Sequence, residues 1–286
     1  MIFTTNKKRL LKHFRKDPVL FAYHMGDLDD FFFPDCLWPA IFDARGDIDD
    51  VLLTYTGGDT PVLLAFGRSD RFDDLLREYL PIAPKKFFCH FQKQHHAILR
   101  EFARETPLGT HLKMKLDEVQ FAELCRSGPR RGGWSRQSQC RDGKHPDLRL
   151  DAVIRLDPSH ESQLRALYAA AYPDSYFTPR MLPTGKFFGH LDNGAIVAVA
   201  GVHVVSDEYR IAALGNIATH PDYRGRGLAT LVTHRLTNEL VSEGKMVCLN
   251  VKADNAPAIA CYRKIGFAPV HEYEEAVFEL TGTLRV

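Results

Sequence analysis

Apolar positions in the second half of the chain predict buried strands and an amphipathic helix. Continuous apolar runs occupy residues 195–205, 211–218 and 246–251, with the length and composition of buried strands. Between the last two runs, apolar residues recur at helical spacing, at Leu228, Leu231, Val232, Leu236 and Leu240. This pattern predicts a strand that leads into a helix and a second strand after the helix.

The elements before these strands follow the same kind of pattern. Residues 148–156 predict a strand, and Asp157-Pro158-Ser159 is a start signal for a helix that runs to Tyr172. Residues 186–191 predict a strand joined to the 195–205 strand through Asp192-Asn193-Gly194, a hairpin signal. The second half is therefore predicted to be an α/β domain with a mixed sheet (α+β).

The first half repeats this order of elements. Two short helices are predicted over residues 6–16 and 17–25. After them come strands at 37–43, 50–56 and 60–66, a helix from Ser69 to Leu80, a strand at 86–91, a helix at 95–105 and a strand at 111–116. The strand-strand-helix-strand-helix-strand order matches the second half, so we predict two related domains, at 1–116 and 150–286.

The segment between these domains, residues 117–149, is expected to be a basic linker or long loop. From Arg126 to Arg149 it contains seven cations against two acids and few apolar residues. The alternative is a basic lid that contacts an anionic acceptor or a cofactor phosphate.

Residues 215–230 place a glycine-rich turn between a strand and a helix. The first N–H groups of a helix lack intrahelical partners, and the helix dipole adds positive potential there. Gly225 and Gly227 carry no side chains that would keep a pyrophosphate from the backbone. Such glycines also occur in ordinary tight turns, and the Walker and dinucleotide patterns are absent here.

Two motifs in order make the interpretation specific. The turn reads Arg224-x-x-Gly227-x-Ala229 and resembles the acyl-CoA pyrophosphate loop of the GNAT superfamily of N-acyltransferases. Downstream, Asn255-x-x-Ala258-x-x-x-Tyr262-x-x-x-Gly266-Phe267 resembles the second CoA-side motif of that family. The resemblance implies a GNAT acyl-CoA N-acyltransferase fold, preceded by a degenerate GNAT-like α/β domain.

The resemblance also implies the site residues. Acetyl-CoA would be the co-substrate, with no metal. Backbone groups of Ile217, Ala218 and Thr219 would hold the pantetheine and the thioester carbonyl. Tyr262 would act as general acid toward the leaving thiolate, or would instead be a packing tyrosine. The remaining implied cofactor contacts are Arg224, Gly225, Arg226, Gly227, Leu228, Ala229, Thr230, Asn255 and Ala258.

The sequence says less about the residues that bind the acyl acceptor. In GNAT folds the segment between the first two helices lines the acceptor pocket, which makes Tyr172, Tyr176, Phe177 and Arg180 candidate substrate contacts, or parts of a structural loop. No general base is evident, because Ile211 and Ala212 stand where many relatives carry a glutamate. The candidates for this role are His190, His203, Asp207, Glu208 and water.

The two-domain arrangement resembles the glycine N-acyltransferase group, so an amino acid or other small amine is the first expected acceptor and a protein lysine or N-terminus the second. A non-catalytic acyl-CoA sensor is the rival interpretation. In the first half, Ala65–Asp70 stands where the phosphate loop belongs, with one glycine, and Asp70 and Asp73 would repel phosphate. We therefore expect that half to be structural or regulatory.

Composition sets the remaining expectations. With 45% hydrophobic and 26% charged residues and a net charge of +1, the chain reads as a globular protein without a nucleic-acid or membrane partner. Six cysteines without Cys-x-x-Cys spacing predict reduced thiols and a cytoplasmic location. His90, His95 and His96 lack metal-ligand spacing, and an oligomer is compatible with the sequence.

Overall fold

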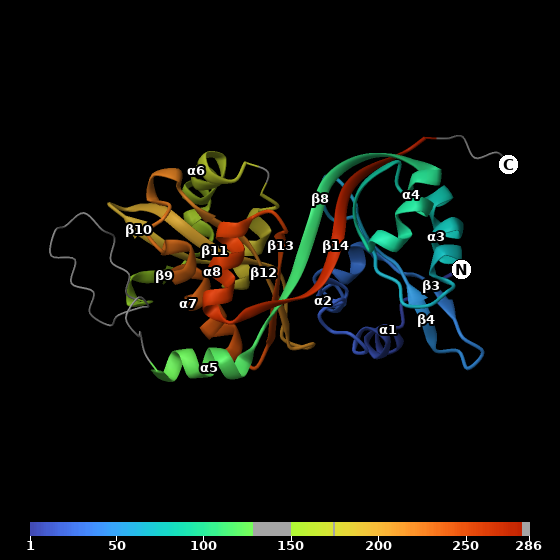
Figure 1. Ribbon diagram of the computed structural model, residues 1–286, viewed down its shortest axis with the longest axis horizontal. Coiled ribbons are helices and arrows are strands. Elements are labelled where there is room, and N and C mark those ends of the chain that lie inside the picture. The colour runs from blue at the N-terminus through green and yellow to red at the C-terminus, as the bar shows by residue number, and fades with distance from the viewer. Residues whose placement is uncertain (128–149, 174, 282–286) are drawn as a thin grey trace. The chain divides into compact units, whose positions relative to one another are not determined.

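The computed structural model describes residues 1–127, 150–173 and 175–281, and it divides into two compact units (Figure 1). The first unit contains Met1–Lys113, Val251–Asn255 and Pro269–Val286. The second contains Met114–Asn250 and Ala256–Ala268. Each unit is thus assembled from segments that lie far apart in the sequence.

The second unit is built on strands in the order β13-β12-β11-β10-β9. These are β9 (Val153–Arg155), β10 (Phe188–Asp192), β11 (Ala195–Ser206), β12 (Ile211–Thr219) and β13 (Met246–Lys252). Neighbouring strands from β9 to β12 are antiparallel, whereas β12 and β13 are parallel. This is the mixed sheet that the apolar pattern predicts.

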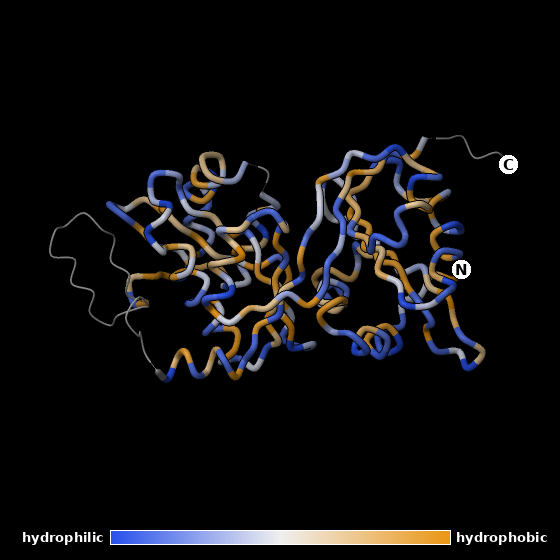
Figure 2. The backbone as a smooth tube through the Cα atoms, in the orientation of Figure 1, coloured by the Kyte–Doolittle hydropathy of each residue, from blue (hydrophilic) through white to orange (hydrophobic). Residues whose placement is uncertain are grey.

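Helices cover both faces of this sheet. They are α5 (Glu118–Ser127), α6 (Glu161–Ala171), α7 (Leu228–Ser242) and α8 (Ala256–Ile265). Helix α6 contacts β11 and β12, and α7 contacts β10, β11 and β12. Residues 196–202 of β11 are all buried, as a strand covered on both faces requires, and the hydropathy of the chain follows this burial (Figure 2).

The first unit has two sheets. The smaller contains β1 (Ile2–Phe3), β3 (Pro39–Phe42) and β4 (Ile48–Val51) in the order β1-β3-β4. The larger contains, in the order β2-β5-β6-β7-β14-β8, the strands β2 (Cys36–Leu37), β5 (Leu53–Tyr55), β6 (Val62–Ala65), β7 (Lys86–Phe91), β14 (Phe267–Leu280) and β8 (Ala103–Leu116). Strands β5 and β6 are antiparallel and β6 and β7 are parallel, so the β12–β13 arrangement has a counterpart here.

The first unit contains helices α1 (Lys7–Phe14), α2 (Ala22–Gly26), α3 (Phe72–Tyr79) and α4 (His96–Phe102). Several boundaries differ from the predicted ones, and the strand predicted over residues 50–56 is divided between β4 of the smaller sheet and β5 of the larger one. Ser69 does not cap α3, whose N-cap is Arg71, because the Ser69 N–H donates to Asp50 at 2.6 Å and the chain turns around that carboxylate first. Helix α4 ends at Phe102, because β8 (Ala103–Leu116) begins at the next residue in an extended conformation.

The C-terminal strand β14 belongs to the sheet of the first unit. It pairs antiparallel with β7, from Glu274 opposite Phe91 to Glu279 opposite Lys86. Ala276 and Phe278 are fully buried in the same core as Phe87 and Phe91. The core of the first unit therefore requires the last strand of the chain.

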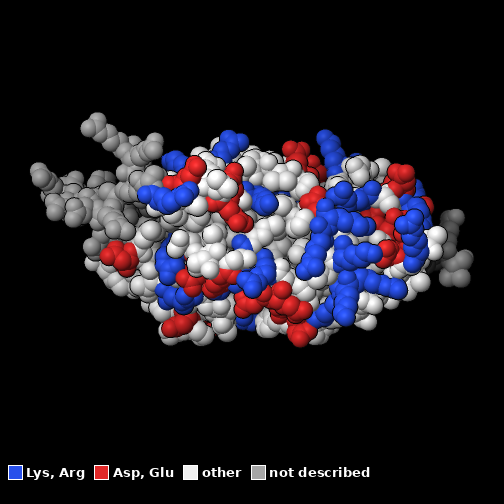
Figure 3. Space-filling view, turned by 90° about the horizontal axis from the view of Figure 1, so that it is seen from below, with Lys and Arg blue, Asp and Glu red and all other residues white. Residues whose placement is uncertain are grey.

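Charge is distributed unevenly over the first unit. Helix α1 and the two residues that follow it carry exposed cations, at Lys8, Arg9, Lys12, Arg15 and Lys16. Figure 3 shows Lys and Arg side chains gathered toward the right of the view. The whole-chain charge of +1 does not reveal this local basic surface.

Three histidines of the first half, His90, His95 and His96, pair with carboxylates. His90 lies 3.3 Å from Glu275, His95 lies 2.7 Å from Asp73, and His96 lies 2.8 Å from Glu105.

Among the described residues, no helix is both long and apolar enough to cross a membrane.

A buried histidine predicts acid sensitivity of the second unit. Burial lowers the pKa of His234 on α7 to about 4, and its ring packs against Phe121. The unfolded state binds this proton near pH 6.5 but the folded state only near pH 4, so stability falls as the pH drops through that window. The free energy of unfolding of the wild type should fall between pH 7.5 and pH ~5, and His234→Leu should reduce this fall by roughly 2 kcal/mol. Urea unfolding of both proteins near pH 5 and pH 7.5 measures it. An equal fall in the free energy of unfolding of both proteins would contradict this prediction.

Candidate active site

Strands β12 and β13 part from each other before β12 ends. Their parallel register runs from Ile211 opposite Met246 to Leu214 opposite Leu249, and within the described residues it stops there. Strand β12 continues beside β11 until Thr219 pairs with Ala198. An opening between two parallel strands exposes backbone groups that a ladder would otherwise use, so an extended ligand can bind there.

Two β-bulges lie next to this point. Between the pairs Gly201–Gly215 and Val199–Ala218, β12 has two residues, Asn216 and Ile217, opposite one residue of β11. Asn216 has a φ of 54°, in the left-handed region.

The second bulge places a histidine beside the first. Between the pairs Val202–Leu214 and Val204–Ala213, His203 is the extra residue of β11. A β-carbon added at Gly215 would lie 1.9 Å from the His203 ring, so only glycine leaves room for the imidazole. The two bulges thus bring His203 against the part of β12 where the sheet opens.

Polar side chains near the opening have buried atoms without partners. Among the described residues, no hydrogen bond reaches Asn216 Oδ1, Thr219 Oγ1 or Asn250 Nδ2. Asn216 and Thr219 come from β12 and Asn250 comes from β13. Buried polar atoms are costly when unsatisfied, so this set fits a ligand arm with amide groups. Asn250 is not among the site residues predicted from the sequence, although it interrupts the apolar run 246–251.

The glycine loop follows β12 directly. Pro221–Tyr223 form one 3₁₀ turn, Gly225 and Gly227 have φ values of 75° and 81°, and α7 begins at Leu228. Gly227 is the N-cap and supplies no side-chain cap to the first N–H groups of α7. This is the geometry of an anion site, with exposed donors at the positive end of a fifteen-residue helix.

Two arginines brace this loop. Arg224 donates from Nε to the Thr219 carbonyl at 3.2 Å and from its terminal nitrogen to the Ala171 carbonyl at 3.1 Å. Arg226 donates to the Asp222 carbonyl at 2.8 Å and stacks over Tyr223. The side chains therefore fix the loop while adding positive charge to it.

Tyr262 lies on α8, which packs against α7. Thr230 Oγ1 on α7 lies 3.2 Å from Cys261 Sγ on α8. Tyr262 is 7% exposed and its ring contacts Phe267 edge-on. Burial raises the pKa of Tyr262, with smaller contributions from Cys261 and Tyr172, so the phenol is protonated at neutral pH. Asn255 directly precedes α8, and Ala258 lies in its first turn.

The predicted acceptor segment has two kinds of residue. Phe177 packs between Tyr168 and Phe187, with ring centroids 5.1 and 5.8 Å away, so its side chain is part of the hydrophobic packing. Tyr172, Tyr176 and Arg180 are exposed. Tyr176 lies edge-on to His203 with centroids 6.2 Å apart, so the segment and the β11 bulge meet.

The other candidate bases are placed differently. A hydrogen bond from Lys245 lowers the pKa of Asp207, which makes that carboxylate a weaker base. Glu208 is exposed in the turn after β11, and His190 is 3% exposed on β10. Of these side chains, His203 is the one that borders a bulge of β12.

The corresponding loop of the first unit is closed by its own side chains. Parallel pairing of β6 with β7 runs to the last residue of both strands, Ala65 opposite Phe91. The Arg68 and Ser69 N–H groups donate to the fully buried Asp50, at 3.0 and 2.6 Å.

Two further side chains complete this closure. The Gly67 N–H donates to Gln92 at 3.0 Å, and a β-carbon at Gly67 would lie 1.9 Å from Phe72. The N–H groups that would face a phosphate are therefore used internally.

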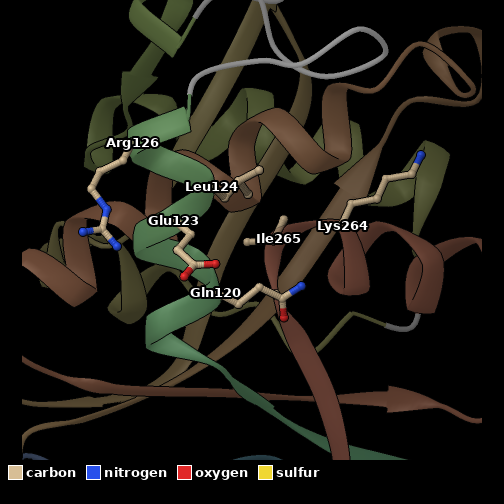
Figure 4. A pocket seen from close by; sticks show the side chains of 7 residues that line it. Gln120, Glu123, Leu124, Arg126, Lys264 and Ile265 are labelled. Atoms are coloured by element: carbon tan, nitrogen blue, oxygen red, sulfur yellow. The ribbon is translucent and has the colours of Figure 1, made fainter.

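A cavity of about 570 Å³ lies elsewhere in the second unit, between α5 and the end of α8 (Figure 4). It is lined by Gln120, Glu123, Leu124, Arg126, Lys264, Ile265 and Gly266. None of these is a predicted site residue, and their charges are of both signs. The opening beside β12 and the glycine loop, rather than this cavity, define the candidate site.

Comparison with known proteins agrees with this geometry. Residues 154–267 match the family model described as the acetyltransferase (GNAT) family. This part of the chain is a GNAT domain. The match contains the opening between β12 and β13, the glycine loop and Tyr262, so the family resemblance inferred from the two motifs is confirmed.

Curated relatives match parts of the chain. The [ribosomal protein bS18]-alanine N-acetyltransferase of Escherichia coli K12 is 43% identical over 76 residues, which are 26% of this chain and 49% of that protein. The uncharacterized N-acetyltransferase YobR of Bacillus subtilis is 35% identical over 162 residues, 56% of this chain and 62% of that protein. The chain thus spans about half the length of the E. coli relative.

A solved structure extends the likeness to both units. A tandem GNAT protein from the clavulanic acid biosynthesis pathway covers 99% of this chain and 98% of its own, with a TM-score of 0.56 and 14% identity. At this identity the likeness concerns the fold. It confirms the predicted arrangement, a GNAT-like α/β fold in the first half followed by the GNAT domain.

Proposed function

We propose that the chain is an N-acetyltransferase that moves an acetyl group from acetyl-CoA to a primary amine, with one cofactor site, in the second unit. The observation that carries the proposal is the parting of β12 from β13 directly before an uncapped helix N-terminus. A pantetheine arm needs the first feature and a pyrophosphate needs the second. The related N-acetyltransferases support the reaction class.

The residues that would hold acetyl-CoA are those of the opening and the loop. Backbone groups of Ile217, Ala218 and Thr219 would bond the pantetheine and the thioester carbonyl, with Asn250 and Asn255 as additional polar contacts. The N–H groups from Arg224 to Thr230 would bind the pyrophosphate, and Ala258 would lie beside the arm. The thioester supplies an activated acyl carbon and a thiolate leaving group.

Acid and base would then lie on different elements. Tyr262 would donate to the departing thiolate. For the base, we favour His203, directly or through a water, because it borders the bulge of β12 and the acceptor segment. Direct attack by a neutral amine would form the amide without a covalent enzyme intermediate.

The acceptor we propose is an α-amino group, and Tyr172, Tyr176 and Arg180 are the exposed residues that would meet it. A free amino acid remains our first candidate. The E. coli relative is named for an alanine of a ribosomal protein, which makes a peptide N-terminus the second candidate. Both present the same nucleophile, and they differ in the group beyond the α-carbon, a carboxylate in one and a peptide bond in the other.

Thiol release from acetyl-CoA tests this proposal. The full chain would be assayed against amino acids, polyamines and peptides with different N-termini, and each acceptor would be checked for the added mass of an acetyl group. We expect amine-dependent release with at least one α-amine. Tight binding of acetyl-CoA without release for any amine would instead indicate an acyl-CoA sensor.

A further inference from the structure

Tyr168 joins helix α6 to the bulge of β12. It is 4% exposed, and its hydroxyl donates to the carbonyl of Asn216 at 2.8 Å. Packing against Phe177 holds the ring in place. Burial raises the pKa of Tyr168, so the hydroxyl remains a donor at every working pH. The proposed acid and base roles of Tyr262 and His203 do not involve this buried phenol.

The hydrogen bond sets the orientation of one peptide unit. The described residues contain no cis peptide bond, so the carbonyl of Asn216 and the N–H of Ile217 point in opposite directions across their shared plane. With the carbonyl held toward α6, the Ile217 N–H is directed away from α6. Asn216 is also held from its side chain, which donates to Met181 Sδ at 3.5 Å.

The regular hydrogen bonds between β11 and β12 do not set the orientation of this peptide unit. Asn216 and Ile217 are the bulged pair, and Asn216 has left-handed φ although it is not glycine. Such a conformation persists only where its surroundings determine it, and it is typical of functional sites. The hydrogen bond from Tyr168, which lies on α6, holds Asn216 in this conformation.

We propose that Tyr168 is a positioning residue for acyl transfer, whose hydroxyl fixes the Asn216–Ile217 peptide so that the Ile217 N–H polarises the thioester carbonyl. The inference rests on the proposed function, since it assumes a thioester in the opening between β12 and β13. Tyr168 itself touches neither reacting atom. Its contribution is to hold a donor aligned before charge develops on the carbonyl oxygen.

Tyr168→Phe tests the role, because it keeps the packed ring and removes the hydroxyl. We expect kcat to fall about tenfold, with the Kd for acetyl-CoA changed by less than about threefold, because the phosphate loop is intact. Tyr79→Phe is the matched control, since Tyr79 is a 1%-exposed tyrosine of the first unit whose hydroxyl bonds Thr54 at 2.6 Å. It should lose similar stability and keep kcat. Equal losses of kcat in both variants would overturn the inference.

A spectroscopic readout separates positioning from folding. Infrared difference spectra of bound acetyl-CoA labelled at its carbonyl should show a band shifted to lower frequency in the wild type and a smaller shift in Tyr168→Phe. Asn216→Gly keeps Tyr168 and the backbone carbonyl that accepts its hydrogen bond, so it should retain most of the wild-type shift. An unchanged band and unchanged kcat in Tyr168→Phe would overturn the positioning role alone. A wild type that binds no acetyl-CoA would overturn the proposed function as well.

Discussion

Gly227→Glu is expected to reduce the affinity for acetyl-CoA by at least about 100-fold while leaving the protein folded. Gly227 is exposed, has a φ of 81° and immediately precedes α7. Glutamate would place bulk and negative charge where we propose the pyrophosphate binds. A charged hydrogen bond contributes roughly 1.5–3 kcal/mol, so losing two of them accounts for the expected change. Calorimetric titration measures it.

The control for this variant is Gly46→Glu. Gly46 lies in the turn between β3 and β4 with a φ of 78°, and no atom lies within 4 Å of an added β-carbon. Both substitutions introduce the same side chain at the same kind of left-handed position, at a backbone cost of about 1–2 kcal/mol. We expect Gly46→Glu to bind acetyl-CoA normally. Near-unchanged affinity in Gly227→Glu would contradict the assignment of the loop.

Tyr262→Phe is expected to lower kcat about 100-fold, with the affinity for acetyl-CoA changed by less than about tenfold. The substitution keeps the ring that packs on Phe267 and deletes the phenolic proton. The raised pKa of Tyr262 keeps that proton in place but weakens complete transfer, so the expected effect is at the lower end for a general acid. Steady-state kinetics with the best acceptor from the thiol-release panel would measure it.

Pre-steady-state rates must accompany this comparison, because slow product release would hide a change in the chemical step. Tyr79→Phe again serves as the control for loss of a buried hydroxyl. If the single-turnover rate of Tyr262→Phe equals that of the wild type, Tyr262 is a packing residue and the thiolate takes its proton from water.

The sequence was sufficient for the family and for the fold of both halves. The signals were local: apolar runs with strand lengths, an amphipathic helix after a glycine turn, and a second motif ending at Gly266-Phe267. These patterns depend on chain geometry within about ten residues. The structure follows them in β11, β12, α7 and β13 with shifts of one or two residues.

Features that depend on distant pairing were not predicted. Strand β14 carries Glu272, Glu274, Glu275 and Glu279, and its partner β7 lies about 180 residues earlier, so no local pattern places it in the first unit. The bulges at His203 and Asn216 arise from the register of β11 against β12. Neither residue type at these positions signals an extra residue in a strand.

The first unit also combines a feature that the local sequence predicts with contacts that it does not predict. The sequence showed that its loop has a single glycine, Gly67, but it did not show what takes the place of a phosphate. In the structure, Asp50 from β4 accepts the N–H groups of Arg68 and Ser69, and Phe72 occupies the space beside Gly67. These contacts join residues up to 19 positions apart, and they explain why we propose a single cofactor site.

Calorimetric titration of the full wild-type chain with acetyl-CoA tests the central proposal most directly. The full chain is required because β14 completes the core of the first unit, so a fragment ending at residue 116 would lack a strand of its own sheet. We predict one molecule bound per chain, with binding lost in Gly227→Glu and kept in Gly46→Glu. Two molecules per chain would contradict the closure of the first unit, and no binding would contradict the site itself.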